Sequence, residues 1–275
     1  MKFQPVIKWT GSKRSQSEEI IKYFPKEIDT YYEPFCGGCS VLFQLLHSDI
    51  KVNRYVCSDK NKGLIDLWNL IKSNPKELAD GYRIMWNELN IDDDKERKKE
   101  YFYKVRERYN KNHNPIDFMF IMRTTTNGMP RYNKEGNFNN SFHVTRNGIL
   151  PNKLEKIIYE WSEILNKHNV QFIHQEYNSI LSNKDDFLYL DPPYANTKGM
   201  YYGVINYDML WNWMNNQQGK YVLSFDGKTS SEDMTQDIPL DIYTKHIYIN
   251  SGNSSFRRVI GKSKNTYVKE SLYIK

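Results

Sequence analysis

The stretch from residue 33 to residue 40, EPFCGGCS, lies between an apolar run and a helical one, and it decides the fold. Its two adjacent glycines let a backbone turn sharply and approach a ligand closely, as in nucleotide-type cofactor loops. Cys36 and Cys39 also give the stretch the C-x-x-C spacing of a redox dithiol. The first interpretation predicts a cofactor loop between a strand and a helix, whereas the second predicts thiol redox chemistry.

Strands and helices alternate on both sides of this turn. The sequence predicts a strand at 30–35, a helix at 40–47, a second strand at 54–61 and a second helix at 64–72. Such alternation is typical of βαβ units and a parallel sheet. Five later strands are expected at 170–175, 185–194, 219–227, 242–250 and 266–275. The sequence therefore predicts an α/β fold.

Residues 73–166 differ in character from both flanks. They begin with two charged helical segments, 75–89 and 96–110, and continue into NGMPRYNKEGNFNNSF at 127–142. The crowded NG, KEG and NN turn signals in this stretch indicate a hairpin. We therefore expect an α/β domain made of residues 1–72 and 167–275, interrupted by an inserted, mainly helical lobe at 73–166.

Composition narrows the class of protein. The 275 residues are 39% hydrophobic and 26% charged, and three cysteines are too few for a disulfide scaffold. A metal site would need a second pair of ligands beside Cys36 and Cys39, and the six histidines form no such pair, so we expect no metal site. No apolar run is long enough to cross a membrane, and the first residues lack the apolar core of a signal peptide. These features lead us to expect a cytoplasmic protein with no membrane partner.

The net charge of +6 is concentrated in two stretches. Residues 95–111 hold eight Lys and Arg against three Glu, and residues 245–269 hold six Lys and Arg with no acid. Basic clusters of this kind suit a nucleic-acid backbone. The first cluster is equally compatible with a solvated helix stabilised by Glu–Lys pairs.

The stretch FLYLDPPY, residues 187–194, carries the strongest chemical signal. In an open α/β sheet, ligands bind beyond the carboxyl ends of the strands, so Asp191 should face a cleft. Pro192 and Pro193 stop the strand and leave carbonyl groups free to accept hydrogen bonds. With the flat ring of Tyr194, these acceptors match the exocyclic amino group of a nucleobase. The simpler alternative is a strand that ends in a proline turn with an exposed aspartate.

Four motifs in order resemble one enzyme family. IKWTGSKR at 7–14, EPFCGGCS at 33–40, the hairpin stretch at 127–142 and DPPY at 191–194 are similar to the motifs of Dam-type (D12 class, alpha-group) DNA adenine-N6 methyltransferases. The resemblance implies a Rossmann-like class I S-adenosylmethionine-dependent methyltransferase sheet. It also implies an inserted target-recognition lobe with a β-hairpin, S-adenosyl-L-methionine as cofactor, and double-stranded DNA as partner.

The resemblance also assigns residues to roles. Asp59 follows Gly37 by 22 residues, the spacing at which an acid meets ribose hydroxyls in βαβ cofactor sites. The implied cofactor-binding residues are Trp9, Lys13, Phe35, Gly37, Asp59 and Asp191. The implied catalytic residues are Asp191, Pro192 and Tyr194. The implied DNA-binding residues are Met129, Arg131, Asn133, Asn139, Arg257 and Arg258.

Three positions depart from the family pattern. Cys39 replaces the last glycine of the cofactor loop, Ser141 replaces a proline of the hairpin, and His143 stands where glycine is frequent. The target sequence therefore stays open, with GATC only as the default. A cognate restriction endonuclease, acting without a stable complex, is compatible with the same motifs.

Several other activities remain open at this point. Methylation of cytosine N4, or of an amino group in RNA or protein, would use similar motifs. Asp191 favours adenine, because the cytosine enzymes more often carry Ser-Pro-Pro-Tyr and the glutamine enzymes Asn-Pro-Pro-Tyr. A DNA-binding protein without catalytic activity and a thiol redox enzyme using Cys36 and Cys39 are the remaining alternatives.

Overall fold

The sheet is the centre of the computed structural model, which describes residues 4–194, 205–229, 232–253 and 267–275. Seven strands are hydrogen-bonded in the order β3-β2-β1-β4-β5-β7-β6. They are β1 (Glu27–Glu33), β2 (Lys51–Asp59), β3 (Gln171–His174), β4 (Phe187–Leu190), β5 (Lys220–Thr229), β6 (Lys245–Asn253) and β7 (Tyr267–Ile274). The first five run parallel, and β7 runs antiparallel to both β5 and β6. The predicted α/β fold with a Rossmann-like sheet is confirmed.

Some helices connect the strands, and others pack together into a helical body. The helices are α1 (Ser17–Ile20), α2 (Ser40–Leu46), α3 (Lys62–Ser73), α4 (Pro75–Leu89), α5 (Lys95–Asn112), α6 (Pro115–Thr124), α7 (Pro151–Lys167) and α8 (Tyr207–Asn215). The helical body consists of α4, α5, α6 and α7. Asparagine or aspartate side chains cap the N-termini of α3, α4, α5 and α6 by accepting backbone N–H bonds. None of the described helices is both long and apolar enough to cross a membrane.

Alternation along β4 explains why helices cover both faces of the sheet. Phe187 and Tyr189 belong to the hydrophobic core that contains α2, α3 and α7, whereas Leu188 and Leu190 belong to a second core with α8. Successive strand residues point to opposite faces, so a strand without polar residues is buried on both sides. This packing places the end of β4, and therefore Asp191, at an edge between two fixed layers.

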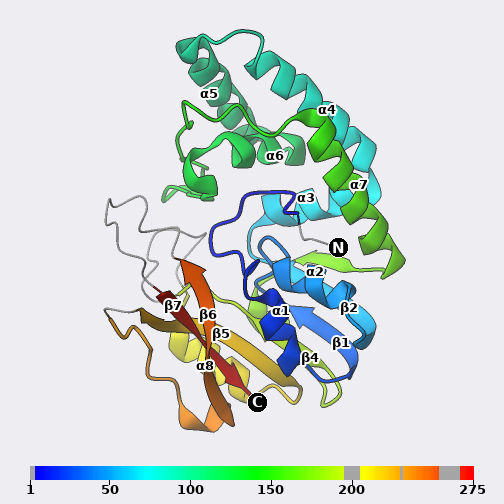
Figure 1. Ribbon diagram of the computed structural model, residues 1–275, viewed down its shortest axis with the longest axis vertical. Coiled ribbons are helices and arrows are strands. Elements are labelled where there is room, and N and C mark those ends of the chain that lie inside the picture. The colour runs from blue at the N-terminus through cyan, green and yellow to red at the C-terminus, as the bar shows by residue number, and fades with distance from the viewer. Residues whose placement is uncertain (1–3, 195–204, 230–231, 254–266) are drawn as a thin grey trace.

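The helices α4, α5 and α6 lie at the opposite end of the molecule from β6, β7 and α8 (Figure 1). α3 packs against both α6 and α7, so it joins this helical body to the sheet. The aromatic rings of Trp68 in α3 and Trp161 in α7 lie 4.9 Å apart. The N-terminal segment is attached to the helical body, because Arg123 in α6 donates to the carbonyls of Pro5 and Val6.

The predicted hairpin follows α6. It contains two isolated antiparallel bridges, Thr125 with Phe142 and Tyr132 with Phe138, and the described residues in it form no longer ladder. Between these bridges, Asn133 closes the turn by accepting backbone N–H bonds from Glu135 and Asn137. The hairpin path is therefore confirmed, and both backbone and side-chain hydrogen bonds hold it.

Candidate active site

A cavity of about 1270 Å³ opens where the N-terminal segment, the Gly37–Gly38 turn and the carboxyl end of β4 meet. Nine of the residues singled out from the sequence line it: Trp9, Lys13, Phe35, Gly37, Asp59, Met129, Asp191, Pro192 and Tyr194. Arg131, Asn133 and Asn139 belong to the hairpin but do not line the cavity. Arg257 and Arg258 lie outside the described residues. The expected cofactor and catalytic residues thus share one cavity, and Met129 joins them from the hairpin together with Asn127 and Pro130.

The glycine turn is shaped by Trp9. Gly37 has a φ of +46°, and a Cβ added there would lie 2.7 Å from Nε1 of Trp9. The Gly37 carbonyl accepts a hydrogen bond from Nε1 of the buried Trp68 at 3.0 Å. Because Trp9 covers the turn so closely, only a residue without a side chain fits at position 37.

Asp59 lies opposite this turn, at the end of β2. Its carboxylate accepts backbone N–H bonds from Gly37 at 3.2 Å and from Asn61 at 2.9 Å. Burial raises the pKa of Asp59 to about 6, and these two hydrogen bonds partly offset the rise. Each carboxylate oxygen can accept a further hydrogen bond, as a ribose hydroxyl would require.

Asp191 is held by a buried cation. Nζ of Lys13 lies 2.7 Å from Oδ1 of Asp191 and 3.0 Å from Oε1 of Glu270 in β7. Burial raises the pKa of Asp191, and the ammonium of Lys13 opposes that rise. Burial also works against the charge on Lys13, but the attraction of the two carboxylates prevails and raises the pKa of the lysine. Lys13 therefore remains charged and favours the ionised form of Asp191.

Glu270 and Gln16 belong to this site, although no sequence motif pointed to them. Glu270 accepts hydrogen bonds from the Tyr194 hydroxyl and from Nε2 of Gln16. Gln16 also donates to Oγ of Ser251 at 2.6 Å, so the network reaches β6. A single acid in a strand carries no pattern of its own. The only available signal was that Glu270 occupies a mostly apolar strand, where an acid needs a buried partner.

The hairpin side of the cavity is built from polar contacts that position its backbone. The side chain of Asn140 donates to the carbonyls of Thr126 and Met129, each at 3.0 Å, and this holds Met129 at the cavity. Asn133 uses its side-chain oxygen to close the turn, so this atom supports the hairpin. Arg131 is exposed and does not line the cavity.

The basic stretch at 95–111 forms α5, and local acids neutralise much of it. Arg97 pairs with Asp92, Lys98 with Asp93, Lys99 with Glu96 and Arg108 with Asp117. Arg106 donates to a hairpin carbonyl. These contacts favour the interpretation of this stretch as a helix stabilised by ion pairs. The basic residues 257–264 of the second stretch lie outside the described ranges.

The three cysteines do not form a redox site. Cys36, Cys39 and Cys57 are all free thiols and all buried. Burial raises the pKa of Cys36 to about 11 and that of Cys39 well above its ordinary value. A reactive cysteine is exposed and has a lowered pKa, so both observations oppose the dithiol interpretation.

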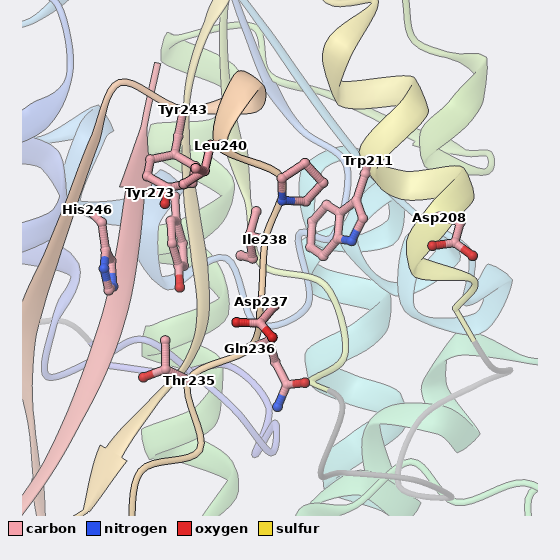
Figure 2. A pocket seen from close by; sticks show the side chains of 11 residues that line it. Asp208, Trp211, Thr235, Gln236, Asp237, Ile238, Leu240, Tyr243, His246 and Tyr273 are labelled. Atoms are coloured by element: carbon pink, nitrogen blue, oxygen red, sulfur yellow. The ribbon is translucent and has the colours of Figure 1, made fainter.

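A smaller hollow of about 660 Å³ lies between α8, the η5 turn (Leu240–Ile242) and strands β6 and β7. Figure 2 shows its side chains, which include Trp211, Tyr243 and Tyr273. The ring of His246 stacks on Tyr273 with 4.3 Å between centroids. This hollow contains none of the residues singled out from the sequence. Within the described ranges, no group of three or more His, Cys, Asp or Glu side chains could hold a metal ion.

Comparison with known proteins adds independent information. The model of the D12 class N6 adenine-specific DNA methyltransferases matches residues 9–268. The chain is 31% identical to the type II methyltransferase M.MjaIII of Methanocaldococcus jannaschii over 208 residues, which cover 70% of each chain. It is 31% identical to the DNA adenine methylase of Escherichia coli, covering 69% of this chain and 64% of that enzyme. For the DNA adenine methylase of Haemophilus influenzae the identity is 29%, with 71% and 65% covered.

Among solved structures, an rRNA methyltransferase of Streptomyces viridochromogenes aligns with 94% of this chain and 81% of its own. Its TM-score is 0.38 and its identity 11%, values too low to support an argument. The family match spans almost the whole chain and includes the Gly37–Gly38 turn, the hairpin and Asp191. The chain therefore belongs to the D12 class of N6 adenine-specific DNA methyltransferases.

Proposed function

We propose that this enzyme methylates N6 of an adenine that has left the DNA duplex, with S-adenosyl-L-methionine as methyl donor and Asp191, Pro192 and Tyr194 as catalytic residues. One observation carries the proposal. The Asp191 carboxylate, held by Lys13 at 2.7 Å, lines the same cavity as the Gly37 turn and Met129 of the hairpin. An acceptor for an amino group, a cofactor loop and a DNA-side residue thus meet in one space.

The residues around the cavity fit S-adenosylmethionine. About 1270 Å³ exceeds the usual range for a single small ligand, so it has room for the cofactor and for an extruded base. Asp59 would accept the ribose hydroxyls, and the rings of Trp9 and Phe35 would contact apolar and cationic parts of the cofactor. When bound, the cofactor supplies an activated methyl group.

The catalytic residues act by positioning and electrostatics. Asp191 would accept one N6 hydrogen and the Pro192 carbonyl the other, which aims the nitrogen lone pair. Tyr194 would stack on the base, and its hydroxyl is already held by Glu270. Lys13 keeps the Asp191 carboxylate charged in a buried setting, so the acceptor is strong before the substrate arrives.

We propose residues 73–166 as the target-recognition lobe. An adenine inside a duplex cannot reach the cavity, so the base must be flipped, at a cost of a few kcal/mol. Met129 lines the cavity and suits a wedge at the vacated base step. The exposed Arg131 suits a bidentate contact with a guanine, and Asn139, also exposed, suits a polar contact with DNA. The target sequence is set by this hairpin.

Replacing Asp191 tests the proposal. Asp191→Ala should lower methyl transfer to duplex DNA at least about 100-fold, because one acceptor of the N6 hydrogens is removed. Thermal unfolding should change little, since Lys13 keeps Glu270 as a partner. Turnover of Asp191→Ala at the normal rate would contradict the assignment.

The modified base should be identified by mass spectrometry of nucleosides from DNA treated with the wild-type enzyme. N6-methyladenine is the expected product. N4-methylcytosine, or label found only in RNA, would instead support the alternatives that the motif leaves open. If the protein binds DNA but leaves it unmethylated, it is a DNA-binding protein without catalytic activity.

A further inference from the structure

The buried ion cluster at the end of β4 contains more negative than positive groups. Lys13 contacts both Asp191 and Glu270, at 2.7 Å and 3.0 Å. The side chains of Lys13 and Glu270 are only 7% and 6% exposed, so water screens their charges weakly. One ammonium therefore faces two carboxylates in a low-dielectric setting.

Other nearby groups do not supply the missing positive charge. Glu33, at the end of β1, has a pKa of about 8 because it is buried, so it is mainly uncharged at neutral pH. Burial likewise raises the pKa of the Tyr189 phenol in β4. Lys8, Arg14, Lys60, Arg146 and Asp226 also line the cavity, but the charges that shift the pKa of Glu270 are those of Lys13 and Asp191. The remaining contacts of Glu270, from Tyr194 and Gln16, are neutral hydrogen bonds.

The pKa of Glu270 reflects this excess of negative charge. Burial raises its pKa to about 7; Lys13 pulls it down and Asp191 pushes it up. Near neutral pH, Glu270 is therefore partly protonated, and this proton takes the place of a second cation in the cluster. A cationic ligand that enters the cavity would displace this proton, because a positive charge nearby favours the ionised carboxyl.

We propose that Glu270 is a positioning residue for the methyl donor: with Asp191 it makes the cluster one negative charge richer than Lys13 can neutralise, and this excess selects the cationic sulfonium over the neutral thioether product. The inference rests on the proposed function, because it concerns the same cavity. S-adenosylmethionine and S-adenosylhomocysteine differ by one methyl group and one positive charge. A site that favours this positive charge binds the donor more tightly than the product.

Calorimetric titration with each of the two ligands tests the proposal without any turnover. In Glu270→Gln, the affinity for S-adenosylmethionine should fall about tenfold, equivalent to 1.4 kcal/mol, while that for S-adenosylhomocysteine changes less than about twofold. Glu270→Asp keeps the charge and should largely restore the preference for the donor. Asp59→Asn is the matched control, because an acid expected at the ribose should affect both ligands by the same factor.

A second measurement separates charge from structure. At pH 7, titrations in buffers of different ionisation enthalpy should show that S-adenosylmethionine releases more protons than S-adenosylhomocysteine does. This difference should vanish in Glu270→Gln, whose folding is checked by circular dichroism. If Glu270→Gln does not fold, the proton release of the wild-type enzyme and the Glu270→Asp affinities still decide.

Some outcomes would overturn the inference. Equal weakening of both ligands in Glu270→Gln, or equal proton release by both ligands in the wild type, would reduce Glu270 to a structural residue. In that case the enzyme would still methylate adenine, so the proposed function would stand. If neither ligand bound the wild-type protein, the proposed cofactor itself would be wrong.

Discussion

Cys39 adopts a left-handed backbone conformation, with φ at 53° and ψ at 36°, at the start of α2. This conformation explains why the family pattern has glycine there, since a side chain costs about 1–2 kcal/mol in the left-handed region. In this chain the Cys39 side chain is completely buried in the main hydrophobic core. Its burial in this core offsets the backbone cost.

Gly37 is less tolerant than position 39. Gly37→Ala should reduce the affinity for S-adenosylmethionine by at least about tenfold, because the new methyl group would lie 2.7 Å from Trp9 and the φ of +46° disfavours alanine. Calorimetry would measure the affinity. Gly38→Ala is the control: its Cβ would lie 3.2 Å from Cβ of Trp9, and its φ is outside the left-handed region. Equal effects of the two substitutions would contradict the explanation.

The candidate site was predictable where its residues belong to local motifs. Asp191 and Gly37 stand in short runs whose residue types reflect strand ends and tight turns. Glu270 and Gln16 are 254 residues apart, and their contact depends on where β7 lies in the sheet. Strand order is set by the packing of the whole sheet, so a single sequence does not reveal such a pair.

At the level of elements, α6 shows that hydrophobic periodicity does not reveal every helix. The sequence predicts α4 and α5 as charged helical segments, but it does not predict α6 as a separate helix. Residues 117–124 of α6 are all buried, so this helix has no polar face to create a 3.6-residue pattern. Its Asn114 cap and Pro115 at the first turn were the remaining signals.

One contact ties the hairpin to the cofactor side of the sheet. Asn61 caps α3, donates its backbone N–H to Asp59, and donates its side-chain N–H to the Tyr132 hydroxyl at 2.8 Å. Tyr132 also forms a bridge with Phe138 in the hairpin. Asn61 thus links Asp59, the acid expected at the ribose, to Tyr132, which follows Arg131 in the hairpin.

Tyr132→Phe should therefore loosen the hairpin without removing the ring. We expect a loss of about 1 kcal/mol in the free energy of unfolding, because the buried amide of Asn61 loses its partner. Hydrogen exchange over residues 126–140 should accelerate, while Tyr159→Phe, at a 42% exposed position on α7, should leave it unchanged. Unaltered exchange in Tyr132→Phe would show that this contact does not support the hairpin.

At the scale of the whole molecule, three buried acids make stability depend on pH. Burial raises the pKa of Asp59 to about 6, of Glu270 to about 7 and of Glu33 to about 8. In each case the folded protein holds the proton more tightly than the unfolded chain does. Stability from these groups is therefore greatest in mild acid and falls as pH rises from about 4 toward 8.

Glu33 offers the clearest test, since its carboxyl is 2% exposed and accepts a hydrogen bond from the Tyr31 hydroxyl at 2.7 Å. Glu33→Gln keeps the shape and the acceptor but cannot ionise. In urea unfolding, the variant should match the wild type at pH 5 and be more stable at pH 8.5, by on the order of 2–4 kcal/mol. Glu27→Gln is the control, because a hydrogen bond from Lys51 lowers the pKa of that exposed acid. The stability difference between Glu33→Gln and the wild type could instead stay constant as pH rises. Glu33 would then be ionised in the folded protein, and a group other than those described would balance its charge.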